Sequence, residues 1–288
     1  TRVTPPSAAW AGLSLGGRTH VMGIVNVTPD SFSGDGLSAA DAAADQAARM
    51  WADGAAVIDV GGESTRPGAT PVDAAAELAR VVPAIRAIRA RLPDAPISID
   101  SMKASVAAAA LDAGATIVND VTGFAFDDRM SSLCAERRTP VVLMHNAARA
   151  DALDGESYAA SDDGPGFLDR LTAALTQLRA RAIAAGVTQE RILLDPGIGF
   201  GKSPGQNLAI VKHVGALRAA LGAPILIGAS RKSFIGRIIG GAPDERSAGD
   251  AAISALAAAG GADLLRVHDA PLARAAAAIG RAVAGAEA

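Results

Sequence analysis

Acidic, amide and basic side chains recur at the ends of short apolar segments of this chain. Asp100, Asn119 and Asp195 supply carboxylate and amide groups that could accept N–H bonds from a flat, donor-rich heterocycle such as an aminopyrimidinone. Arg266 and His268 stand two residues apart, so on a strand they share one face and suit a phosphate. Together they predict a ligand with a hydrogen-bonding ring at one end and an anion at the other.

Further positive charge follows the preceding apolar segment, where the chain reads Ser230-Arg231-Lys232. We therefore expect one side of the site to be positive and the other side to be acidic. The alternative is that these polar residues are ordinary caps and surface groups at strand ends, which are common in any sheet protein. Their recurrence at every apolar segment favours a single functional rim.

The stretch "LDPGIGFGKS" (194–203) ends like a phosphate-binding P-loop but does not fit that motif. The pattern G-x-x-x-x-G-K-[ST] would place its first glycine at position 196, which is Pro196 and has no N–H to donate. We interpret the stretch as the end of a strand and its loop, in which Phe200 is an apolar wall and Lys202 a surface lysine.

Eight short apolar runs alternate with segments of helical character. The runs cover 20–27, 56–62, 96–101, 116–123, 140–146, 191–197, 224–230 and 264–270. The helical segments cover 38–53, 73–92, 103–113, 127–138, 165–186, 205–221, 245–260 and a last one from about 271. Continuous apolar strands that alternate with helices are typical of a parallel sheet buried on both faces.

Eight such units predict an α/β fold, a (β/α)8 TIM barrel that forms a single domain over 20–288 after an N-terminal extension, 1–19. The active site of such a barrel lies at the carboxyl ends of its strands, where the polar residues gather. The alternative is an open doubly wound sheet, but its usual G-x-G-x-x-G after the first strand is absent. Residues 147–164 are polar and predict a long surface loop.

Composition excludes several classes of protein. The 288 residues carry 27 Lys and Arg against 30 Asp and Glu, a net charge of −3 that gives no support to nucleic-acid binding. Cys134 is the only cysteine, so no disulfide framework exists and we expect a cytoplasmic protein. The N-terminus has no signal-peptide pattern, and no uncharged apolar run of about 18 residues predicts a membrane span.

Several longer motifs resemble one family. They are "MGIVNVTPDSFS" (22–33), "DVGGESTRPGA" (59–69), "SIDSMK" (98–103), "NDVTG" (119–123), "LMH" (143–145), "LDPGIGFGK" (194–202), "GASRKSFIG" (228–236) and "RVHD" (266–269). In order and spacing they resemble the dihydropteroate synthases, enzymes of folate biosynthesis. The resemblance runs from about residue 20 to the end of the chain.

The resemblance implies a reaction and its substrates. The family joins 6-hydroxymethyl-7,8-dihydropterin diphosphate to 4-aminobenzoate, and the products are 7,8-dihydropteroate and pyrophosphate. It also implies Mg²⁺ near Asn26, a homodimer and sensitivity to sulfonamides. We expect an SN1-like path, because carboxylates beside the pterin would favour the cation left when pyrophosphate departs.

The resemblance assigns residues to each part of the ligand. The pterin would contact Asp100, Asn119, Met144, Asp195, Gly228 and Lys232. The diphosphate would contact Asn26, Arg66, Arg266 and His268. The aminobenzoate would contact Thr65, Arg66, Pro67, Phe200 and Ser230. The catalytic set would be Asp100, Asp195, Lys232, Arg266 and His268.

Other polar residues of the motifs are open to more than one interpretation. Asp59 could touch a metal or orient Asn26, or be structural, and we expect Glu63 to anchor a loop. His145 is as compatible with a structural role as with a catalytic one. The first loop reads "SFSGDG" where the family has "SFSDGG", which shifts Asp35 by one position and leaves its metal role open.

Three other functions remain possible at this point. A methyltransferase of the wider pterin-binding group would share the ring-binding aspartates but has little use for "STRPGA" and "SRK". A Schiff-base aldolase would use Lys232. A non-catalytic pterin-binding paralogue would keep the site without the reaction.

Overall fold

Eight parallel strands form the centre of the protein. The computed structural model describes residues 9–28, 36–64, 70–147 and 166–286. The central strands are β3 (His20–Asn26), β4 (Val57–Gly61), β5 (Ile97–Asp100), β6 (Ile117–Asp120), β7 (Val141–Met144), β8 (Ile192–Asp195), β9 (Leu226–Ile227) and β10 (Leu264–Val267). Each lies within one of the eight apolar runs of the sequence.

The sheet closes into a barrel. Its strand order is β8-β7-β6-β5-β4-β3-β10-β9, and every pairing between neighbours is parallel. The two edges meet where Leu194 of β8 forms a parallel bridge to Ile225, the residue before β9. The predicted (β/α)8 barrel is therefore confirmed, and the open doubly wound sheet is excluded.

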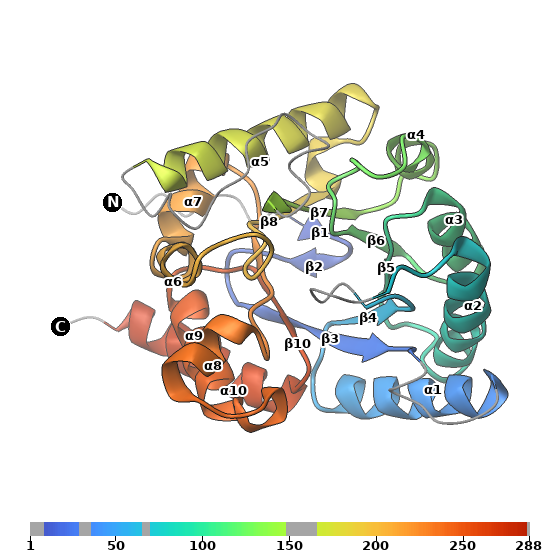
Figure 1. Ribbon diagram of the computed structural model, residues 1–288, viewed down its shortest axis with the longest axis horizontal. Helices are drawn as coiled ribbons and strands as arrows, with labels where there is room; N and C mark the ends of the chain where they lie inside the picture. Colours follow the sequence, from blue (N-terminus) through green and yellow to red (C-terminus); the bar gives the residue numbers. More distant parts are fainter. Residues whose placement is uncertain (1–8, 29–35, 65–69, 148–165, 287–288) are drawn as a thin grey trace.

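Helices surround this barrel on the outside (Figure 1). They are α1 (Gly36–Ala52), α2 (Ala74–Arg91), α3 (Ala104–Ala113), α4 (Arg129–Glu136), α5 (Phe167–Ala184), α6 (Pro204–Lys212), α7 (Val214–Leu221), α8 (Ser233–Ile239), α9 (Ser247–Ala259) and α10 (Ala270–Gly285), with short 3-10 helices at Gln189–Arg191 and Pro243–Glu245.

Two features of the helical layer differ from the sequence prediction. The segment 205–221 is divided, because His213 has φ −113° and ψ 22° and breaks the helix between α6 and α7. Helix α8 was not predicted at all. It has seven residues, too few for a helical period to stand out, and it begins directly after Lys232.

The interior of the barrel is filled by side chains from alternate strand positions. Met22, Val57, Ile117, Leu193 and Leu264 pack together with Val142 and Leu226 in one buried cluster. Trp10 and Leu15 belong to the same cluster and are each 1% exposed. The hairpin of β1 (Ala9–Trp10) and β2 (Leu13–Ser14) thus fills the amino-terminal end of the barrel, at the centre of the ring in Figure 1.

A second core lies between the strands and the helices. Strand residues such as Val25 and Ile99 pack there against small helix residues such as Ala47 and Ala107. Alanine favours the helix and lets it approach the sheet closely, which explains the alanine-rich composition of these segments. Within the part of the chain that the structure describes, no helix is long and apolar enough to span a membrane.

Candidate active site

The carboxyl ends of the strands place a row of polar side chains inside the barrel mouth. Neighbouring strands pair Asn26 with Gly61, Gly61 with Asp100, and Asp100 with Asn119. Paired residues of a parallel sheet point to the same face, so these side chains share the inner face. The Cβ that Gly61 lacks would lie 3.8 Å from Asn26 Oδ1 and 3.7 Å from Asp100 Oδ2, so both side chains converge over this glycine.

The alternation of a strand separates residues that are adjacent in the sequence. Asn119 faces the mouth, whereas the next residue, Asp120, faces away from it. The Asp120 carboxylate accepts the backbone N–H groups of Thr122 and Phe124, so it stabilises its own turn. The interpretation of strand-end aspartates as structural groups is therefore right for Asp120.

Arg266 lies between two aspartates. Its Nε donates to Asp59 Oδ2 at 2.6 Å, and its Nη2 donates to Asp100 Oδ2 at 2.5 Å. Asp59 is fully buried and also accepts a hydrogen bond from Asn119 Nδ2 at 3.2 Å. Burial lowers the pKa of Arg266, but the carboxylates of Asp59 and Asp100 outweigh it and raise the pKa above its usual range.

This arrangement corrects the expectation of separate positive and acidic sides. The guanidinium of Arg266, assigned to the anion, touches Asp100, which was assigned to the ring. The two kinds of group alternate around one mouth because β10, β3, β4 and β5 are neighbours in the sheet. Asp59 orients both Arg266 and Asn119, a function that its position before "GGESTRPGA" does not reveal.

The carboxyl group of Asp100 has an unusually high pKa. Burial raises the pKa to about 7, and the nearby charges of Asp59, Glu77 and Asp120 add to this effect, while Arg266 opposes it. Burial sets the direction of the shift, because the single guanidinium of Arg266 does not offset the hydration that the Asp100 carboxylate loses. The mouth favours a ligand that brings N–H donors or positive charge.

Asp195 lies on the far side of Arg266. It pairs with Met144 across the sheet, and both residues are buried. Burial also raises the pKa of Asp195, although the N–H of Gly197 at 2.7 Å and the charge of Lys232 lower it. A Cβ on Gly228 would lie 3.8 Å from Asp195 Oδ2 and 3.7 Å from Arg266 Cβ, so this glycine leaves space between the two side chains.

Lys232, the residue before α8, reaches to the loop after β8. Its Nζ lies 4.0 Å from the centroid of the Phe200 ring, which is a cation–π contact. A Cβ on Gly199 would lie 2.9 Å from Lys232 Cδ, and Gly199 has φ +82°, so only glycine suits this position. Lys232 and Phe200, assigned to different substrates, therefore form one wall.

Lys202 is not the surface lysine that the sequence suggested. Its Nζ donates to the backbone carbonyls of Gly197 at 2.9 Å, His145 at 3.2 Å and Phe200 at 3.2 Å. Burial lowers its pKa to about 7, even though the residue as a whole is only partly covered. Lys202 thus ties the loop after β8 to the end of β7.

His268 and Ser230 form a third part of the mouth. The Ser230 hydroxyl lies 3.1 Å from His268 Nδ1 and 2.8 Å from Asp250 Oδ2. Ser230 was assigned to aminobenzoate, but its hydroxyl contacts these two side chains. No motif pointed to Asp250, which lies inside the predicted helix 245–260.

Glu63 anchors the loop after β4, as expected. Its carboxylate accepts the N–H of Val72 at 3.3 Å and a hydrogen bond from Lys103 Nζ. Lys103 also donates to Glu77 at 2.6 Å, and the Glu77 side chain is fully buried. These contacts tie the two described ends of that loop to α2 and to the start of α3.

Some predicted residues are not placed by the structure. Thr65, Arg66, Pro67 and Asp35 lie outside the described residues, as does most of the predicted loop 147–164. His145 is described, and its burial, followed by the charge of Lys202, lowers its pKa to about 3. A neutral imidazole at this position cannot act as a general acid near neutral pH.

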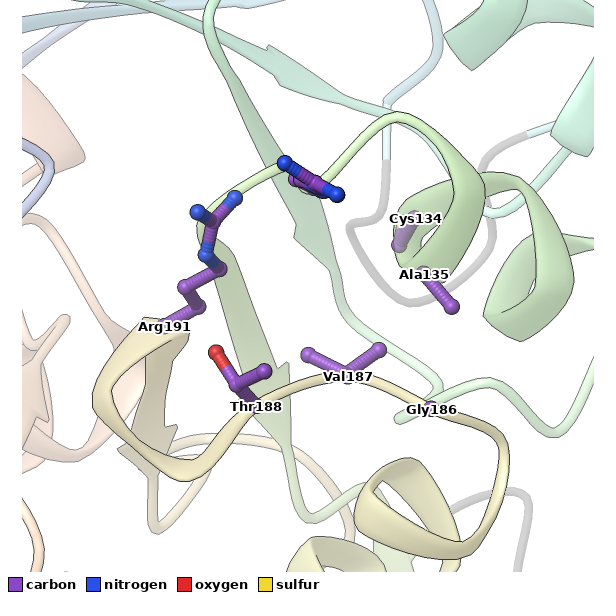
Figure 2. A pocket seen from close by; sticks show the side chains of 7 residues that line it. Cys134, Ala135, Gly186, Val187, Thr188 and Arg191 are labelled. Carbon is purple, nitrogen blue, oxygen red and sulfur yellow. The ribbon is translucent and has the colours of Figure 1, made fainter.

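A cavity of about 350 Å³ lies at the other end of the barrel (Figure 2). Arg138 and Arg191, which line it, precede β7 and β8, so the cavity is at their amino-terminal ends. Its wall includes Cys134, whose thiol pKa burial raises to about 12. A thiol that stays protonated is a poor nucleophile, and the cavity takes no part in the site described above.

Comparison with known proteins agrees with the geometry. The model of the family described as "Pterin binding enzyme" matches residues 22–268. A dihydropteroate synthase of Bacillus subtilis (strain 168) is 43% identical over 92% of this chain and 87% of its own length.

Two solved structures are also similar. Dihydropteroate synthase of Xanthomonas albilineans with 4-aminobenzoic acid is 40% identical, has a TM-score of 0.84, and the match covers 96% of this chain and 97% of that one. The Yersinia pestis enzyme in complex with a sulfonamide drug is 36% identical, with a TM-score of 0.85 and coverage of 96% and 99%.

The barrel and the polar mouth define a ring-binding enzyme of the TIM-barrel class. The chain belongs to the pterin-binding enzyme family and, within it, to the dihydropteroate synthases. The resemblance seen in the sequence motifs is therefore confirmed.

The raised pKa of Asp100 predicts a pH-dependent cost in stability. Its pKa of about 7 in the folded protein exceeds its ordinary value of 3.8, so ionisation opposes folding increasingly as pH rises toward 7. The amide of Asp100→Asn does not titrate. We expect the unfolding free energy of this variant, relative to wild type, to rise by about 2–3 kcal/mol between pH 5 and pH 8.

Urea denaturation at several pH values measures this difference. Asp53→Asn, an exposed position at the opposite end of the barrel, is the matched control. A difference between Asp100→Asn and wild type that stays constant over this pH range would show that Asp100 ionises normally in the mouth.

Proposed function

We propose that this protein joins 6-hydroxymethyl-7,8-dihydropterin diphosphate to 4-aminobenzoate and releases pyrophosphate, through the residues of the barrel mouth. The observation that carries the proposal is the Asp59–Arg266–Asp100 network. In this network, carboxylates that suit a nitrogen-rich ring contact a guanidinium that suits a diphosphate.

The ring-binding half consists of hydrogen-bond acceptors with one cation. Asp100 and Asp195 accept N–H groups of the pterin, and Asn119 can accept through its Oδ1 because its Nδ2 already donates to Asp59. Lys232, which lies near Asp195, donates to the ring oxygen. Met144 and Gly228 form the slot in which the flat ring lies.

The diphosphate lies on the other side of Arg266. A guanidinium has five N–H groups, and Asp59 and Asp100 use two of them. The remaining donors bind phosphate oxygens, with further hydrogen bonds from His268 and Asn26. Because Asp59 and Asp100 hold the guanidinium in place, little freedom is lost when the anion binds.

A magnesium ion fits the diphosphate-binding side of the mouth only together with the substrate. Among the described residues, no group of three or more His, Cys, Asp or Glu side chains could hold a metal by itself. Mg²⁺ commonly keeps several waters and is bound by one or two protein oxygens plus substrate phosphates. Asn26 would supply a protein oxygen, and the ion would supply charge that stabilises the departing diphosphate.

The reaction then follows from the charges around the reacting carbon. The C–O bond breaks, its electron pair leaves with pyrophosphate, and Arg266 and His268 stabilise the new negative charge. Asp100 and Asp195 stabilise the pterin methylene cation. The amine of 4-aminobenzoate attacks this cation, and the acidic ammonium that forms gives its proton to water or to pyrophosphate. No strong base is therefore needed, and positioning supplies much of the rate.

The aminobenzoate lies against the wall made by Phe200 and Lys232. The neighbouring backbone of Ser230, together with Thr65, Arg66 and Pro67, would surround its carboxylate end. A sulfonamide, which copies the aryl amine and its anionic end, would compete for the same place. The relatives from Xanthomonas albilineans and Yersinia pestis bind 4-aminobenzoic acid and a sulfonamide drug, respectively, which supports both compounds as ligands of this protein.

We also propose a cytoplasmic homodimer. Cys134 is a free buried thiol, which suits a reducing compartment. Five of the eight exposed large apolar side chains among the described residues lie on α8, α9 and α10, namely Ile238, Ile239, Leu256, Ile279 and Val283. These helices are neighbours in Figure 1, and this apolar surface suits contact with a second copy.

Pyrophosphate release, measured with and without 4-aminobenzoate, tests the function. We expect pyrophosphate to be released only when the pterin diphosphate and 4-aminobenzoate are both present. No release in the presence of both substrates would favour a non-catalytic pterin-binding protein.

Arg266→Lys keeps the charge but loses the planar donor group, so we expect kcat/KM to fall about 100-fold and pyrophosphate to bind about tenfold more weakly. Arg237→Lys, exposed on α8, is the control, and unchanged pyrophosphate affinity in Arg266→Lys would refute the anion assignment.

Sedimentation equilibrium tests the dimer. Leu256 is 59% exposed and Val283 is 68% exposed, so glutamate at both positions would place charge in the interface without disturbing the core. We expect the wild type to have twice the mass of this double variant. Ile183→Glu on α5 should remain dimeric, and a monomeric wild type would contradict the proposal.

A further inference from the structure

The hydroxyl of Ser230 links an outer helix to the active-site histidine. Ser230 follows β9, His268 follows β10, and Asp250 lies in the first turn of α9. Ser230 Oγ lies 2.8 Å from Asp250 Oδ2 and 3.1 Å from His268 Nδ1. The three groups therefore form a chain of two hydrogen bonds.

The single proton of the hydroxyl fixes the direction of this chain. A carboxylate only accepts, so Ser230 donates to Asp250. The backbone N–H of Arg231 also donates to the carboxylate of Asp250, at 2.9 Å and 3.2 Å from its two oxygens, and holds it in place. Having given its proton to Asp250, the Ser230 oxygen can only accept from His268, so Nδ1 must carry a proton.

We propose that Asp250 is a positioning residue that acts through Ser230 to keep the proton of His268 on Nδ1. With the proton on Nδ1, Nε2 of the neutral ring is an acceptor, and it can donate to an anion only after it has taken up a proton itself. The partner of one imidazole nitrogen decides the state of the other, as in many active sites. Nε2 is then the atom of His268 that faces the anion. Only this assignment rests on the proposed function.

Asp250→Asn should reverse the donor and acceptor in both hydrogen bonds without moving the three side chains. The Arg231 N–H needs an acceptor, so the asparagine Oδ1 faces Arg231 and its Nδ2 faces Ser230. Nδ2 then donates to the Ser230 oxygen, and the hydroxyl proton turns toward His268 Nδ1. That nitrogen becomes an acceptor, and the neutral ring carries its proton on Nε2.

Two-bond ¹⁵N–¹H correlation spectra of the histidine rings report the tautomer directly. In the wild type, at a pH where the ring is neutral, we expect the Nδ1–H pattern for His268, and in Asp250→Asn the Nε2–H pattern. Ser230→Ala removes the link and should leave a mixture of the two. Asp244→Asn, an exposed position between α8 and α9, is the matched control and should keep the wild-type pattern.

The same spectra monitor the fold, because the chain has 4 histidines and the other three, His20, His145 and His213, should be unchanged. We expect Asp250→Asn to lower kcat/KM about 10- to 100-fold. An Nε2–H pattern in the wild type, or an unchanged pattern in Asp250→Asn, would overturn the proposal. If the tautomers are as expected but added pyrophosphate leaves the His268 signals unmoved, the link through Asp250 stands and the anion assignment of His268 fails.

Discussion

A partly buried guanidinium shared by two buried carboxylates organises the whole mouth of this barrel. Arg266 bonds to Asp59 and Asp100, and Asp59 also holds Asn119. Removing any one of these side chains would leave a buried charge or polar atom without its partner, which is among the most costly changes a protein can suffer. Burial raises the pKa values of Asp100 and Asp195, so both carboxylates favour a ligand that brings them N–H donors. A ligand that combines N–H donors with a diphosphate complements both parts of the network.

The barrel makes this network possible because it brings distant parts of the chain into register. β10 is last in the sequence but pairs with β3, so Arg266 comes to lie beside residues from the first half of the chain. Strand alternation then decides which polar residues serve the site. Asn119 faces inward and Asp120 outward, although they are adjacent in the sequence and equally polar. Glycines at positions 61, 199 and 228 leave the space in which side chains or a ligand can lie.

The sequence predicted the barrel because buried parallel strands leave a strong pattern, continuous apolar runs separated by helices. It also predicted that polar residues such as Asp100 and Arg266 meet at the carboxyl ends of these strands, as the structure shows, while their ring- and anion-binding roles stay predictions. It did not predict that Arg266 touches Asp100, because this ion pair depends on the pairing of β10, the last strand of the chain, with β3. The sequence was misleading for Lys202, since a lysine that donates to three backbone carbonyls looks like any surface lysine until the loop is folded. No sequence motif indicated the role of Asp250, and the short helix α8 showed no helical period.

A double-mutant cycle of Asp59→Asn and Arg266→Lys, with pyrophosphate affinity measured by calorimetry, tests the shared guanidinium most directly. If Asp59 acts by holding Arg266 for the anion, the second substitution should cost much less once the first is present, with a coupling of at least about 1 kcal/mol. Effects that add to within about 0.5 kcal/mol would contradict the account, because the two residues would then act independently.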